Sequence, residues 1–240
     1  MPRFFVPDLS GETVLLSAED GRHLARSLRC RTGDPVELCD GRGTDGIGVV
    51  AAIQRDAVTV ELRERRPSRS ELPCSVTLYQ ALPKGDKLDF IVQKAVELGV
   101  SAVVPVLTGR CVSRPDKKGM AAKLERWNRI AREAAGQSGR GILPEIRPLL
   151  PYPAALSQMK NAQCPILFYE KADRPLGDAL SSRPGTVSFL VGAEGGFSPE
   201  EVQQAQAAGL AVCTMGPRVL RCETAPLYAL SAIGYVYENQ

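Results

Sequence analysis

The chain has 240 residues, of which 44% are hydrophobic and 24% charged, and its net charge is +3. This composition is typical of a globular protein with a sizeable core, and it excludes a disordered or fibrous chain. No apolar run reaches the roughly 18–20 residues of a membrane span, and the first residues lack the pattern of a signal peptide. We therefore expect a cytoplasmic protein without a membrane partner.

The first 70 or so residues predict short strands separated by Gly, Asp and Pro. A helix over 18–28 interrupts them, with Ser17 as its expected N-cap. Several short strands at close spacing favour a small barrel, and the Arg/Ser/Pro run at 65–70, followed by Pro73, resembles a linker. We predict a first domain over 1–72, with strands at 3–6, 13–17, 35–40, 46–54 and 57–64.

From Cys74 onward, nearly continuous apolar strands alternate with helices, which indicates a parallel sheet covered on both faces. The helix over 86–99 has one apolar face, and a long basic helix is expected over about 118–135. We predict a second, α/β domain over 73–240, with strands at 75–82, 100–107, 165–170, 186–192 and 210–216.

Seven scattered cysteines, without a CxxC pair, accompany a single histidine, His23. The odd number and the dispersal argue against a disulfide framework and a zinc site, so we expect reduced structural thiols and no metal. His23 precedes a basic helix, where capping or packing is a more ordinary role than catalysis.

Basic residues gather in three clusters, at 22–31, at 63–69 and between Arg110 and Arg147. The last stretch holds ten Lys/Arg and four Asp/Glu, a net charge of +6. Any one cluster is equally typical of a solvated helix face. Three clusters together favour a nucleic-acid partner, since arginine binds phosphate in a planar fork.

The segment 190–201, LVGAEGGFSPEE, joins an apolar strand to a helix through three glycines. Their spacing matches neither the dinucleotide-binding nor the phosphate-loop signature. The residues 198–201 predict a capped helix whose first turn already carries acids, and Glu194 adds another. These charges disfavour a diphosphate and favour a cationic or zwitterionic ligand. A tight turn without a ligand is the alternative, although a plain turn seldom requires three glycines.

A second turn, over 214–224, follows the next strand and precedes a helix with Thr224 as its expected N-cap. In an open parallel sheet, ligands bind outside the carboxyl ends of the strands, so the two turns should flank one site. Arg218 and Arg221 could bind phosphate or stabilise negative charge on a substrate. A purely structural pair between Arg221 and Glu223 is the competing interpretation.

VGAEGGFSPEEV and MGPRVLRCETAPLYAL closely resemble the two C-terminal motifs of the ribosomal RNA small subunit methyltransferase E family. HLARSLRCRTGD, LPKGDKLDFIVQKAVELGV, NRIAREAAGQSGR and LPEI extend the resemblance, in order, over nearly the whole chain. The sequence departs from the family pattern at Ala193, where proline is usual, and at Cys222, where threonine is usual. Both positions flank the expected site, and neither removes a charged group.

The resemblance implies an N-terminal PUA-like β-barrel that binds RNA and a C-terminal SPOUT methyltransferase domain with a trefoil knot. It implies S-adenosylmethionine as cofactor and methyl transfer to N3 of one uridine in small-subunit (16S) ribosomal RNA. It also implies a homodimer. The cofactor is a sulfonium cation without phosphate, which suits a glycine turn with acidic neighbours.

The resemblance also assigns residues to the site. The cofactor would contact backbone groups and apolar walls at Leu190, Val191, Gly192, Gly195, Gly196, Met215, Gly216, Val219, Leu220 and Thr224. We expect Arg221 to stabilise negative charge on the uracil oxygens or to hold the adjacent phosphate. Glu223, Glu194 or water could accept the N3 proton. RNA phosphates are expected at Arg22, Arg26, Arg29, Arg31, Arg129, Arg132 and Arg140.

Two other functions stay open at this point. The chain could be an RNA-binding assembly factor without catalysis, although the intact glycine turns and Arg221 count against that. It could also be a SPOUT methyltransferase that acts on another nucleotide, for example in transfer RNA.

Overall fold

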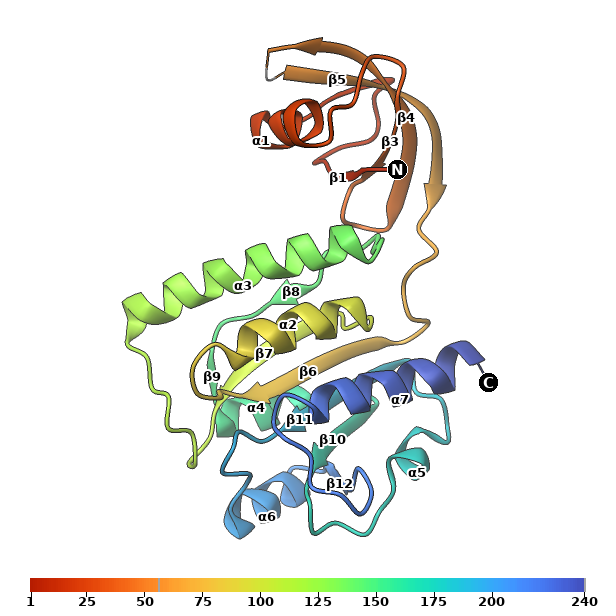
Figure 1. Ribbon diagram of the computed structural model, residues 1–240. Coiled ribbons are helices and arrows are strands. Elements are labelled where there is room, and N and C mark those ends of the chain that lie inside the picture. Colours follow the sequence, from red (N-terminus) through yellow and green to blue (C-terminus); the bar gives the residue numbers. More distant parts are fainter. Residues whose placement is uncertain (56, 240) are drawn as a thin grey trace. The chain divides into compact units, whose positions relative to one another are not determined.

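The computed structural model describes residues 1–55 and 57–239, which form two compact units (Figure 1). Unit 1 comprises Met1–Glu71 and Ala135–Leu143, and unit 2 comprises Leu72–Ala134 and Pro144–Gln240. The change of unit after Glu71 lies next to the predicted boundary after residue 72. The inclusion of 135–143 in unit 1 was not predicted.

Unit 1 is built on a five-stranded mixed sheet in the order β1-β3-β4-β5-β2. β1 and β3 are parallel, and the other neighbours are antiparallel, with bulges along the long β4–β5 pair. The strands lie close to their predicted positions: β1 (Arg3–Phe5), β2 (Thr13–Leu15), β3 (Pro35–Cys39), β4 (Thr44–Gln54) and β5 (Ala57–Pro67).

The helix expected over 18–28 is present in two pieces. α1 (Ala18–Arg22) begins at Ser17, whose hydroxyl accepts from the Asp20 N–H as predicted. It continues as a π-helical turn, η1 (His23–Ser27), in which Leu24 is completely buried. His23 contacts the Phe4 ring edge to face, a packing role.

The segment 135–143 is held in unit 1 by Glu71. The Glu71 carboxylate accepts from the backbone N–H groups of Gly141 and Ile142 and forms an ion pair with Arg140. Arg3 donates to the Arg140 carbonyl at 2.9 Å and pairs with Asp45. These contacts join residues between 42 and 137 positions apart, which is why local sequence patterns did not reveal them.

Unit 2 contains a parallel sheet in the order β12-β10-β11-β6-β7-β8, with β9 also paired to β7. All predicted strands are present, and two short ones were missed. The strands are β6 (Ser75–Ala81), β7 (Ala102–Leu107), β8 (Glu145–Ile146), β9 (Leu150–Pro151), β10 (Cys164–Phe168), β11 (Thr186–Val191) and β12 (Ala211–Cys213).

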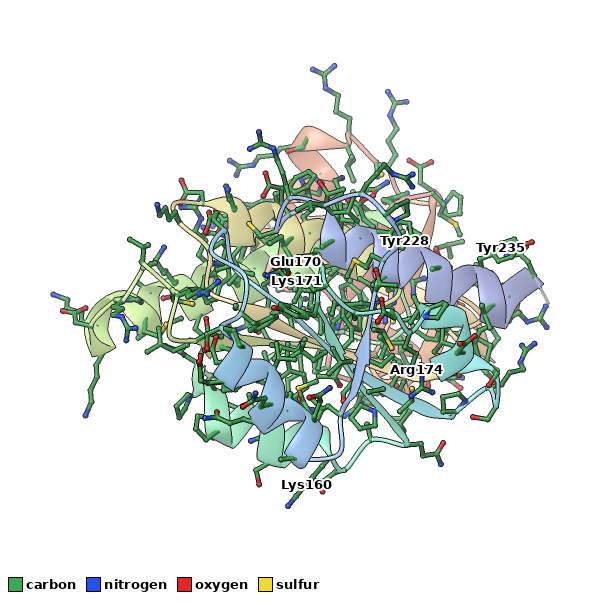
Figure 2. All side chains as sticks on the ribbon, turned by 90° about the horizontal axis from the view of Figure 1, so that it is seen from below. Lys160, Glu170, Lys171, Arg174, Tyr228 and Tyr235 are labelled. Carbon is green, nitrogen blue, oxygen red and sulfur yellow. The ribbon has the colours of Figure 1, made fainter. Side chains whose placement is uncertain are left out.

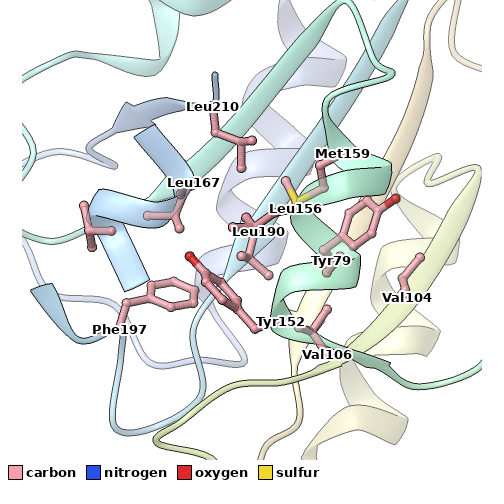
Figure 3. Packing of buried hydrophobic residues seen from close by; sticks show 13 residues of the cluster. Tyr79, Val104, Val106, Tyr152, Leu156, Met159, Leu167, Leu190, Phe197 and Leu210 are labelled. Atoms are coloured by element: carbon pink, nitrogen blue, oxygen red, sulfur yellow. The ribbon is translucent and has the colours of Figure 1, made fainter. Parts of the chain in front are cut away.

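Helices cover both faces of this sheet (Figure 1). α4 and α6 pack over one face, in a core that includes Tyr79, Tyr152, Leu190 and Phe197 (Figure 3). Because side chains alternate along a strand, Phe189 and Val191 point to the opposite face, where they too are buried. The helices are α2 (Lys87–Glu97), α3 (Lys117–Gln137), α4 (Tyr152–Met159), α5 (Leu176–Leu180), α6 (Pro199–Ala207) and α7 (Ala225–Asn239).

The α/β class, with a parallel sheet flanked by helices, is therefore confirmed, whereas the trefoil knot stays a prediction. No helix in the described ranges has both the length and the apolar character needed to span a membrane.

Candidate functional site

A cavity of about 560 Å³ opens at the carboxyl ends of the neighbouring strands β10, β11 and β12. This volume is within the range of about 300–1,000 Å³ typical of small-molecule sites. Its lining comes from the segments 168–170 at the end of β10, 191–197 at the end of β11 and 214–223 before α7, together with Ala225 of α7 and Lys87 at the start of α2. Both predicted turns thus meet at one site.

The glycines of the first turn are required by the turn itself. A side chain on Gly192 would come within 3.0 Å of the Gly196 Cα, and one on Gly195 would meet the Arg110 side chain at 3.0 Å. Gly196 has φ +61°, a left-handed conformation that favours glycine. The number of glycines is therefore explained without a ligand, which corrects that part of the sequence argument.

Helix α6 begins with the predicted capping box. Ser198 accepts from the Glu201 N–H, and the Glu201 carboxylate accepts from the Ser198 N–H at 2.9 Å. Glu201 is 9% exposed, and its second oxygen accepts from the Gly109 N–H at 2.8 Å. This carboxylate thus fixes the helix that follows the glycine turn to the loop after β7.

Gln80, at the end of β6, supports the glycine turn from within the core. It is fully buried, and its Nε2 donates to the carbonyls of Ala81 and Gly192 at 3.2 and 3.3 Å. Together with the bond from Arg110 to the Gly195 carbonyl at 2.8 Å, it ties the turn to two separate segments. The turn is therefore held in place before any ligand binds.

Ionisable side chains on the cavity wall form a cluster around Lys87. Its ammonium lies 2.8 Å from a Glu194 oxygen and 3.5 Å from a Glu223 oxygen. Glu194 also accepts from the Lys84 N–H at 3.2 Å, and the Cys222 thiol donates to Glu223 at 3.1 Å. Glu223 is therefore paired with Lys87, not with Arg221 as the structural alternative supposed.

These contacts shift the pKa values in the cluster. The hydrogen bond from Cys222, reinforced by Lys87, lowers the pKa of Glu223. Burial opposes ionisation of Glu194, but the hydrogen bonds from Lys87 and the Lys84 N–H outweigh it and lower its pKa. Burial raises the pKa of Cys222 to about 12, so this thiol stays neutral. Two carboxylates of low basicity make poor proton acceptors.

Most of the predicted site residues meet in this cavity. Its lining includes the three predicted catalytic residues, Arg221, Glu223 and Glu194, and eight predicted cofactor residues: Val191, Gly192, Gly195, Gly196, Met215, Gly216, Val219 and Leu220. Leu190 is fully buried with its side chain in the core on the other face, so it can offer only backbone groups. Thr224 directly precedes α7 but is not part of the lining.

Sequence reasoning missed several lining residues, among them Lys87 and Glu170. Lys87 stands in the LPKGDKLDF motif just after β6, the neighbour of β11. Glu170 follows β10, the other neighbour of β11 (Figure 2). The rule that ligands bind at strand carboxyl ends would have drawn attention to both, once the strand order was known.

The arginines predicted to bind RNA fall into two groups. Six are exposed: Arg22, Arg26, Arg29 and Arg31 in unit 1, and Arg129 and Arg132 on α3. Arg140 is 3% exposed, and its guanidinium is committed to Glu71 at 2.5–3.1 Å. The prediction of a phosphate contact for Arg140 is wrong, because the side chain is a buried structural cation.

Within the described ranges, His, Cys, Asp and Glu side chains form no group of three or more suited to a metal.

Comparisons with known proteins agree with this arrangement. A family described as RNA methyltransferase domain matches residues 70–234, and one described as RNA methyltransferase PUA domain matches residues 16–63. Ribosomal RNA small subunit methyltransferase E of Bacillus subtilis is 35% identical over 233 residues, which cover 94% of this chain and 91% of that protein.

Solved structures give the same result. The methyltransferase of this name from Neisseria gonorrhoeae, bound to S-adenosyl methionine, is 35% identical with a TM-score of 0.90, over 99% of this chain and 98% of that chain. A putative methyltransferase from Legionella pneumophila, in complex with the same cofactor, is 30% identical with a TM-score of 0.88, over 98% and 97%. The chain belongs to the RNA methyltransferase family that includes ribosomal RNA small subunit methyltransferase E.

Proposed function

We propose that the protein transfers a methyl group from S-adenosylmethionine to N3 of a uridine in small-subunit ribosomal RNA. The observation that carries this proposal is the cavity, in which a glycine turn and the loop before α7 enclose an acidic cluster instead of a phosphate site. The family and its relatives with bound cofactor support the same activity. Action on ribosomal RNA would place the protein in the cytoplasm.

The residues present suit this cofactor. Val191, Met215 and Leu220 supply apolar wall, and three glycines of the turn 192–196 also line the cavity, where they present backbone without a side chain of their own. The cluster of Glu194 and Glu223 around one ammonium keeps a net negative charge, which complements a cation. When bound, S-adenosylmethionine supplies an electrophilic methyl group.

Arg221 is exposed on the cavity wall, where it can act on the substrate base. Uracil N3 must lose its hydrogen to become nucleophilic, and negative charge then spreads onto the two ring oxygens. We assign Arg221 to stabilising that charge or holding the adjacent phosphate. The low basicity of Glu194 and Glu223 favours water as the proton acceptor over either carboxylate.

RNA phosphates would bind the exposed arginines of unit 1 (Arg22, Arg26, Arg29 and Arg31), with Arg129 and Arg132 as contacts on unit 2. The match of unit 1 to a PUA domain of RNA methyltransferases supports this role. Arginine-rich surfaces bind nucleic acid mainly through phosphate, so these contacts would set affinity more than sequence choice.

We also propose that the protein forms a homodimer. α2 and α7 pack together, and α2 carries the exposed Phe90 (46% exposed). α7 carries two more exposed aromatic residues, Tyr228 (42%) and Tyr235 (59%) (Figure 2). Aromatic side chains are enriched at protein interfaces. We propose this aromatic surface as the contact with a second copy, and light scattering of the variant Tyr235→Asp would test it.

A single-turnover assay tests the proposed activity. Purified protein, labelled cofactor and unmodified small-subunit RNA should yield 3-methyluridine. Arg221→Ala should reduce the rate by roughly 100-fold or more while cofactor affinity is unchanged. A rate within about twofold of the original would remove Arg221 from this role. RNA binding without cofactor binding in calorimetry would instead support an assembly factor, and methyl on another nucleoside would support the other enzymatic alternative.

A further inference from the structure

One ammonium group joins two of the loops that line the cavity. Lys87 reaches Glu194 in the turn after β11 and Glu223 in the loop before α7, at 2.8 and 3.5 Å. Its Nζ also lies 3.8 Å from the Cys222 sulfur. The three partners come from two segments about 30 residues apart, and Lys87 itself is on α2, which contributes no other residue to the cavity lining.

Local stability does not explain a lysine at this position. Lys87 is the first residue of α2, at the positive end of the helix dipole, where a cation is unfavourable. Its side chain is 33% exposed, and ion pairs of that exposure contribute little to folding. The position makes sense if the contacts serve the geometry of the cavity.

The charge of the cluster is as relevant as its geometry. Two carboxylates share one ammonium, and the Cys222 thiol is neutral, so a net charge of −1 is held between the two loops. The other ionisable groups in the lining are Glu170, Arg218 and Arg221. A simple electrostatic argument would expect removal of the lysine to tighten binding of a cation. A positioning role predicts the opposite.

We propose that Lys87 is a positioning residue for the cofactor, which holds Glu194 and Glu223 so that the two loops face each other in binding geometry. This inference rests on the proposed function. Without Lys87, the carboxylates would repel each other across the gap between the loops, and the loops would separate. The cofactor would then have to restore their geometry when it binds.

Calorimetry with S-adenosylmethionine and three variants tests the proposal. Lys87→Met should weaken binding by at least about tenfold, and Lys87→Arg should restore most of the affinity. Lys94→Met is the matched control, because Lys94 lies on the same helix, is 34% exposed and forms an ion pair with the nearby Glu97. That control should bind as the original protein does.

Acidification adds a readout that loss of packing alone would not change. In the original protein the low pKa of Glu194 and Glu223 keeps both ionised, so affinity should stay nearly constant between about pH 7.5 and 5.5. Loss of their counter-ion in Lys87→Met raises both pKa values. Protonation of either carboxylate then relieves their repulsion, so the affinity of Lys87→Met should rise as the pH decreases, whereas a purely electrostatic role predicts a fall.

The outcomes separate this inference from the proposed function. If the original protein does not bind S-adenosylmethionine, the proposed function fails and the inference fails with it. If the original protein binds and Lys87→Met binds equally well or more tightly, only the role of Lys87 is refuted. Should Lys87→Met not fold, Lys87→Gln combined with Glu194→Gln provides a double-mutant cycle, in which additive losses would contradict the proposal.

Discussion

Replacing Glu201 by alanine should destabilise unit 2 substantially. The nearly buried carboxylate accepts from the backbone N–H groups of Ser198 and Gly109, at 2.9 and 2.8 Å. A hydrogen bond to a charged group is worth about 1.5–3 kcal/mol, and the alanine variant loses two of them. Because solvent can reach part of the site, we take the lower value and expect a loss of about 3 kcal/mol. Ser198→Ala, which removes one neutral cap bond, should cost about 1 kcal/mol.

Urea denaturation followed by tryptophan fluorescence provides the assay. Trp127 is the only tryptophan, is 1% exposed and donates to Asp89 at 2.9 Å, so its emission reports on unit 2. Gln203→Ala, an exposed change on the same helix, is the control and should leave the midpoint almost unchanged. If Glu201→Ala lowers the free energy of unfolding by no more than Ser198→Ala does, the hydrogen bond from Gly109 to Glu201 does not contribute to stability, and this prediction is wrong.

Arg140, Arg29 and Cys222 each allow a further test. Arg140→Met leaves the Glu71 carboxylate without its buried partner and should destabilise unit 1 by roughly 3 kcal/mol. Denaturant-dependent hydrogen exchange measures this loss, and exchange rates equal to those of the original protein would contradict it. Arg29→Ser should weaken RNA binding for all RNA sequences. It should also reduce the slope of the logarithm of the binding constant against the logarithm of the salt concentration by about 0.7–0.9. Binding that does not depend on salt would refute a phosphate contact. Burial raises the pKa of Cys222 to about 12, so its reactive thiolate form should be rare at about pH 8. Iodoacetamide should therefore modify the more exposed Cys30 first. Peptide mapping that finds Cys222 labelled first would contradict a neutral Cys222 thiol.

The regular elements could be predicted because their signals are local. The apolar runs of β6, β10 and β11, the apolar face of α2 and the capping box at Ser198 each lie within a few residues of sequence. Missed elements were short or atypical: α4 has only eight residues and begins between prolines, and β8 and β9 have two residues each. The change to a π-helical turn at His23 has no sequence signal that we can identify.

The site could be predicted in outline, because strand ends and glycine turns indicated which loops would meet. Its ionic contacts could not, since they depend on distant residues. Lys87 contacts Glu223, which is more than 130 positions away in the sequence, and Arg140 pairs with Glu71, which is 69 positions away. Charge counts treat every arginine as exposed, which is how a structural cation was mistaken for a phosphate contact.

A map of methylated nucleosides in small-subunit ribosomal RNA distinguishes the proposed methyl transfer from its alternatives. RNA from a strain that lacks the gene should be compared by mass spectrometry with RNA from the same strain after the gene is restored. We expect one 3-methyluridine that is absent in the deletion strain, returns with the original gene and does not return with Arg221→Ala. An unchanged map, or a different nucleoside that appears with the gene, would contradict it.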